Sequence, residues 1–131
     1  MIATDATTEQ RTKAVALLGA LDASLARTAE LFIEDDYTVR ECSPNDIFGV
    51  AAENDAIVFV IDHRRGEFDG VGVLKRLRTQ GFTPRVLFIT RDSSIADAVE
   101  VMKCGGAFVL SGHVSAASVV EAVKRELHSQ S

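Results

Sequence analysis

The sequence has few cysteines, no membrane-length apolar run and no secretory leader. Its two cysteines, Cys42 and Cys104, have no CxxC spacing, so neither a disulfide scaffold nor a zinc site is indicated. We expect both to be buried apolar residues in a reducing compartment. No stretch of about 18 apolar residues is present for a membrane span, and the polar segment 1–12 lacks the apolar core of a signal peptide. The expected location is the cytoplasm.

Clustered basic residues and nucleotide-binding motifs are also missing. The formal net charge is −5 and the Lys and Arg residues do not gather in one run, which argues against nucleic acid as partner. We also expect no membrane partner. There is no GxGxxG, no GxxxxGK[ST] and no Ser/His/Asp or Cys/His arrangement at the ends of the expected strands. We therefore expect no enzyme and no resident cofactor. A small-molecule-binding domain is the alternative from another class.

What the chain does contain is typical of one globular domain. It has 131 residues, of which 47% are hydrophobic and 25% charged, close to the averages for soluble domains. We expect a flexible lead over residues 1–12 and a single domain over 13–128.

Short apolar runs alternate with segments of helical period along the whole chain. This alternation is typical of βα units and predicts an α/β fold with a parallel, doubly wound sheet. Pro44 is expected at the first position of the second helix, Gly105-Gly106 should end the fourth, and Ser115 should cap the fifth. The expected strands are 14–18, 37–42, 56–61, 86–90 and 107–111, and the expected helices are 22–36, 44–53, 71–79, 95–103 and 116–127.

One carboxylate stands at the end of a predicted strand. Asp62 directly follows 56–61, the most apolar run of the chain. Ligands of doubly wound sheets bind beyond the carboxyl ends of the strands, so Asp62 is the leading candidate for a functional side chain. A lone Asp at such a place is more often a loop residue or a helix cap, and its neighbours must decide.

Three stretches of the sequence carry a resemblance to a known family. Ile61-Asp62 is followed by Phe68-Asp69-Gly70, Phe88-Ile89-Thr90 is followed by the helical segment 98–105, and 115–127 forms the last helix. In these stretches, and in the 28 positions between Asp62 and Thr90, the chain resembles the receiver domains of two-component response regulators. The resemblance covers nearly the whole chain and implies a flavodoxin-like (βα)5 fold.

The resemblance also implies roles for three residues. Asp62 would be the phosphoacceptor and a metal ligand, Thr90 would supply the hydroxyl that contacts the phosphoryl group, and the backbone carbonyl of Arg64 would be a further metal ligand. Phosphoryl transfer of this kind depends on positioning and charge neutralisation, for which the family uses Mg²⁺.

Other parts of the family's machinery are absent. Its acidic metal-binding pair falls on Gly19 and Ala20, and its lysine falls on Gly112. Mg²⁺ prefers several oxygen ligands, so we expect impaired Mg²⁺-dependent phosphorylation. Asp22 is the nearest substitute ligand, with a helix N-cap as its other interpretation. A working phosphoacceptor that receives its phosphoryl group from a histidine kinase is the alternative function.

Positive side chains stand near Asp62 instead. Arg91 follows Thr90, and His63, Arg64 and Arg65 follow Asp62. We hypothesise that a fixed salt bridge holds Asp62, with Arg91 as the leading partner because an Arg can pair bidentately with a carboxylate. The alternative is that these arginines point into water. His113 is a second possible partner, which would make the site sensitive to pH.

The fifth strand bears on how the domain would signal. The family's switch position falls on Val109, while Phe108 should face the other side of the strand and pack in the core under a helix. The resemblance implies a protein partner, either a histidine kinase, phosphotransferase or effector, or a second copy of the chain. The contact face would be the fourth helix, fifth strand and fifth helix, with Ile95, Val109 and Val120 as exposed apolar residues.

Overall fold

Five parallel strands form one sheet. The computed structural model describes residues 14–19, 23–53, 58–64, 68–90, 95–105, 107–112 and 114–129. The strands lie in the order β2-β1-β3-β4-β5, and every adjacent pair is parallel. This is the expected doubly wound α/β architecture, built as a single flavodoxin-like domain. The strands are β1 (Ala14–Leu18), β2 (Thr38–Glu41), β3 (Val58–His63), β4 (Arg85–Thr90) and β5 (Ala107–Ser111).

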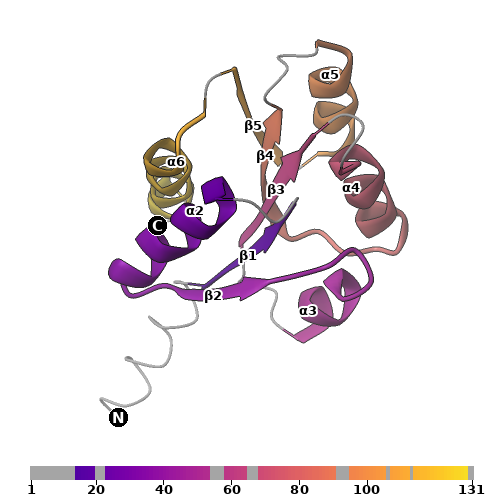
Figure 1. Ribbon diagram of the computed structural model, residues 1–131. Coiled ribbons are helices and arrows are strands. Elements are labelled where there is room, and N and C mark those ends of the chain that lie inside the picture. The colour runs from indigo at the N-terminus through magenta and orange to yellow at the C-terminus, as the bar shows by residue number, and fades with distance from the viewer. Residues whose placement is uncertain are drawn as a thin grey trace.

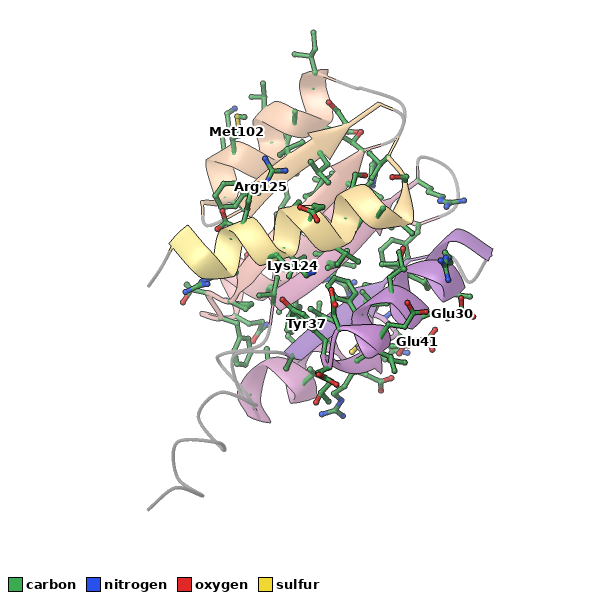
Figure 2. All side chains as sticks on the ribbon, turned by 90° about the vertical axis from the view of Figure 1, so that its left-hand side faces the viewer. Glu30, Tyr37, Glu41, Met102, Lys124 and Arg125 are labelled. Atoms are coloured by element: carbon green, nitrogen blue, oxygen red, sulfur yellow. The ribbon has the colours of Figure 1, made fainter. Side chains whose placement is uncertain are left out.

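Helices cover both faces of the sheet (Figure 1). On one face α2 and α6 pack side by side, and on the other face lie α3, α4 and α5. Figure 2 looks onto the first of these faces, where Lys124 of α6 pairs with Asp35 beyond the end of α2, close to Tyr37. The helices are α2 (Ala23–Glu34), α3 (Ile47–Glu53), α4 (Gly70–Thr79), α5 (Ile95–Cys104) and α6 (Ala116–Ser129).

Alternation of side chains along the buried strands produces two cores. In β3, Phe59 and Ile61 pack against α3 and α4, whereas Val58 and Val60 pack toward α2 and α6. All six residues of β3 are buried, as expected for a strand covered on both faces. The two residues at its end, Asp62 and His63, therefore point to opposite sides of the sheet.

Several predicted boundaries differ from the structure by one to three residues, and two of the differences change the local structure. Pro44 does not begin a helix, because residues 44–46 form a turn in which the Asp46 amide donates to the Ser43 carbonyl, and α3 starts at Ile47. The central strand does not end before Asp62 but continues through His63, since both residues still pair with β4.

The predicted helix ends agree better with the structure. Ser115 caps α6, with its hydroxyl accepting from the Ser118 amide at 3.1 Å, and Gly105 ends α5 with a φ of 76°. Asp69 caps α4 by accepting from the amide of Gly72 at 3.0 Å. Gly106 and the expected lead 1–12 lie outside the described residues.

Two further findings concern the exposure of the cysteines and the absence of membrane-length helices among the described residues. Cys42 and Cys104 form no disulfide and are only partly buried, so the expectation of two buried cysteines is wrong. Within the described segments, no helix combines the length and the apolar character needed to cross a membrane.

Candidate functional site

Asp62 lies where the strand order reverses. The chain runs from β1 outward to β2 and then back past β1 to β3, so the carboxyl ends of β1 and β3 flank the switch point at which doubly wound sheets bind ligands. Gly19 follows β1 there, and Thr90 ends β4 alongside His63. Asp62 is 3% exposed and Thr90 is fully buried. The fold thus brings the two candidate phosphorylation residues to neighbouring strand ends.

The carboxylate of Asp62 faces a guanidinium. Nη2 of Arg64 lies 3.5 Å from Oδ2 of Asp62, and the two side chains are 22% and 5% exposed. This separation is an ion-pair contact at the long limit of hydrogen bonding. It matters because at a partly buried site the attraction between opposite charges is screened far less than in water. The structure places Arg64 as an ion-pair partner of Asp62. Arg91, expected as the leading partner, lies outside the described residues.

The backbone of Arg64 is fixed by a small antiparallel bridge. Its amide donates to the Phe68 carbonyl at 3.0 Å, and its carbonyl accepts from the Phe68 amide at 2.8 Å. The bridge keeps Arg64 next to the end of β3, which explains why its side chain can turn back to Asp62. The carbonyl that the family resemblance makes a metal ligand is already a hydrogen-bond acceptor.

The position after β1 has no room for a side chain. A Cβ placed on Gly19 would lie 2.9 Å from the Cβ of Asp62 and 3.3 Å from its carbonyl oxygen. Both neighbours belong to the buried end of a central strand, which cannot yield as the tip of a flexible side chain would. A carboxylate at position 19 would therefore require the ends of β1 and β3 to move apart.

These contacts decide how well Mg²⁺ fits the described residues. A hard cation needs several oxygens in near-octahedral geometry, whereas the Asp62 carboxylate faces a guanidinium and Gly19 offers no side-chain ligand. The Arg64 carbonyl, which accepts from the Phe68 amide, keeps a second lone pair but would be a single neutral ligand. Across the part of the chain that the structure describes, no three His, Cys, Asp or Glu side chains gather to hold a metal ion. The described residues do not fit a Mg²⁺ site.

His63 has a role that the sequence did not reveal. It is 6% exposed, its Nε2 lies 3.1 Å from Oδ2 of Asp97 in α5, and its Nδ1 accepts from the Gly70 amide at 3.0 Å. Its ring also stacks on Phe88, with the two centroids 5.5 Å apart. The sequence offered only one indication of this role: His63 follows Asp62 on a strand, so its side chain points to the opposite face of the sheet.

Three other candidates, Asp22, Arg91 and His113, fall outside the described residues, as does Ala20.

Val109 is half-buried and packs on the core beneath α3, α4 and α5. Its register partner is Phe88, two pairs before Thr90. An aliphatic side chain there can pack against this core but has no polar atom to offer Thr90.

The expected contact face differs in composition from the prediction. Ile95 is 80% exposed as expected, but Val120 is buried, and Phe108 is 50% exposed rather than packed in the core. Phe108 lines a groove of about 380 Å³ between β5 and α6, together with Leu110, Arg125 and Glu126. Burial raises the pKa of the Glu126 carboxyl. Phe108 lies open because β5 is an edge strand, and Val120 is covered because α6 packs on both the sheet and α2.

The fold is shared with receiver domains of known structure. A CheY-like response regulator receiver domain protein from Methanospirillum hungatei JF-1 is similar over 90% of this chain and 95% of its own, with a TM-score of 0.75 and 15% sequence identity. The receiver domain of a Francisella response regulator gives 0.71 and 20%, over 91% of this chain and 99% of its own. The beryllofluoride-activated NtrC4 receiver domain, a dimer, gives 0.68 and 18%, over 91% and 99%.

No protein-family model and no curated protein matches the sequence of this chain. The structural similarity at these identities establishes the fold.

Proposed function

We propose that this chain is a two-component receiver domain that works through protein contacts, with Mg²⁺-dependent phosphorylation at Asp62 impaired. The observation that carries the proposal is the pairing of Asp62 with Arg64 at the switch point. Asp62 would be the phosphoacceptor by the family resemblance, while the guanidinium of Arg64 would take up the charge that a metal ion would otherwise neutralise. The domain would thus have a binding role and no catalytic one.

The contact face supports a binding role. Four large apolar side chains on α5 and β5 are between 44% and 80% exposed: Ile95, Val99, Met102 and Phe108. Exposed apolar groups interspersed with charges are typical of surfaces that bind other proteins. The partner would be a histidine kinase, a phosphotransferase, an effector or a second copy of the chain, and the NtrC4 domain of the same fold is a dimer.

Titration with Mg²⁺, followed by the amide resonances of Asp62, His63 and Gly19, tests the proposal. We expect no saturable shift in the wild-type protein at millimolar Mg²⁺, because Arg64 opposes a second positive charge beside Asp62. Arg64→Ala should gain a weak saturable response that is lost again when Asp62 is also replaced by Ala.

Arg76→Ala is the matched control, because it removes the same charge from an exposed position on α4 and should leave the titration unchanged. Saturable shifts in the wild-type protein, or no gain in Arg64→Ala, would contradict the role given to Arg64.

A further inference from the structure

A single imidazole joins three elements on one face of the sheet. His63 ends β3, its Nδ1 lies 3.0 Å from the amide of Gly70 at the start of α4, and its Nε2 lies 3.1 Å from Asp97 in the first turn of α5. Both helices lie on the same face (Figure 1). The side chains of His63 and Asp97 are 7% and 19% exposed, so water competes little for the bond between them.

The hydrogen-bond partners fix the tautomer of the ring. The Gly70 amide can only donate, so Nδ1 must accept, and the ring proton of the neutral imidazole lies on Nε2, from where it is donated to the carboxylate of Asp97. Stacking on Phe88 holds the ring in this orientation, and the absence of a side chain at Gly70 leaves room for it. With both nitrogens engaged, His63 offers no free site for a metal ion or for proton abstraction. Its role is one of positioning.

Asp97 places this bond in the first turn of α5. It is the third residue of the helix, and Ile95, Val99 and Met102 of the same helix supply most of the exposed apolar contact face. The middle of α5 is linked to α4 by an ion pair, 3.0 Å long, between Lys75 and Glu100, both about half exposed. Exposed pairs of this kind contribute little. The buried bond to His63 is the stronger constraint on the first turn.

We infer that the His63–Asp97 hydrogen bond couples the strand end that carries Asp62 to the position of α5. A displacement of Asp62 moves its neighbour His63 through the backbone, and His63 transmits the movement to the first turn of α5. Val109 has no polar atom with which to form a parallel route through β5. That the coupling serves signalling rests on the proposed function; the coupling itself does not.

Amide hydrogen exchange on the full chain tests the inference with three single variants. Asp97→Ala removes the acceptor, and His63→Phe keeps an aromatic ring against Phe88 but loses both hydrogen bonds. Each should raise the exchange rates in the second turn of α5 about tenfold, as expected for losing one buried hydrogen bond to a charged group. The first-turn amides have no intrahelical acceptor and do not report it. Asp97→Asn keeps an acceptor oxygen and should restore most of the protection.

The amides of α6 are the internal reference, because that helix lies on the other face of the sheet. The double variant of His63→Phe and Asp97→Ala should exchange no faster in α5 than the faster single variant. Equal acceleration in α5 and α6, unchanged rates in α5 or additive effects in the double variant would overturn the inference. If His63→Phe does not fold, the Asp97→Ala and Asp97→Asn pair still decides it. None of these outcomes depends on phosphorylation, so the proposed function and the coupling fail separately.

Discussion

Replacing Arg78 by Met is expected to lower the free energy of unfolding by about 3 kcal/mol, because each hydrogen bond from a charged donor contributes roughly 1.5–3 kcal/mol and such bonds are not fully additive. The guanidinium donates four hydrogen bonds, of 2.9–3.2 Å, to three backbone carbonyls: Gly105, Phe82 and Pro84. They connect α4 to the end of α5 and to the segment before β4. Burial lowers the pKa of this guanidinium, in keeping with a partly desolvated cation.

Chemical denaturation with matched variants measures this effect. Arg76→Met removes a guanidinium from an exposed position on the same helix and should change stability by no more than about 0.5 kcal/mol. Arg78→Lys should fall between the two, since an ammonium cannot reproduce the planar fork. Equal losses for Arg78→Met and Arg76→Met would mean that the fork contributes nothing beyond its charge.

Replacing Gly70 by Val is the second change with a large expected effect. A Cβ at this position would lie 2.5 Å from Cγ2 of Ile61, 3.1 Å from the Cβ of His63 and 3.2 Å from Cε2 of Phe88. The side chains of Ile61, His63 and Phe88 are all buried. They cannot move aside, so α4 must move away from the sheet. We expect a loss of roughly 3 kcal/mol, at the upper end for overpacked cores.

Gly49 provides the control for this substitution. It lies within α3, and a Cβ there would meet nothing within 4 Å, so Gly49→Ala should stabilise the protein by about 0.5–1 kcal/mol through helix propensity. Thermal or chemical unfolding of both variants measures the contrast. Wild-type stability in Gly70→Val would show that α4 is not held against β3 as the structure has it.

The sequence was sufficient for the architecture because every strand except β2 contains a short continuous apolar run. The predicted 14–18 and 107–111 match β1 and β5 residue for residue. The end of β3 was missed, since a strand that continues through Asp62 and His63 is held by pairing with β4, and hydrophobicity carries no information about that pairing. That Asp62 stands at the carboxyl end of a buried strand was nonetheless predictable from the apolar run that precedes it.

The neighbours of Asp62 were harder to predict. Several arginines follow or flank it in the sequence, and which of them turns toward it depends on local backbone contacts. Arg64 does so because its backbone bridges to Phe68, a contact with no sequence signature. The bond between His63 and Asp97 joins residues 34 positions apart, and only the packing of α5 against the sheet brings them together. The exposure of Phe108 on β5 and the burial of Val120 on α6 likewise depend on which elements cover these two residues.

Whether Asp62 accepts a phosphoryl group is measured most directly by intact mass after incubation with a small phosphodonor and Mg²⁺. A receiver domain that keeps both acidic residues after its first strand serves as the positive control for the donor. The wild-type mass should stay unchanged, as should that of Asp62→Ala, because the guanidinium of Arg64 lies beside the carboxylate and Gly19 offers no metal ligand. A stoichiometric gain of one phosphoryl group in the wild-type protein, absent from Asp62→Ala, would contradict this.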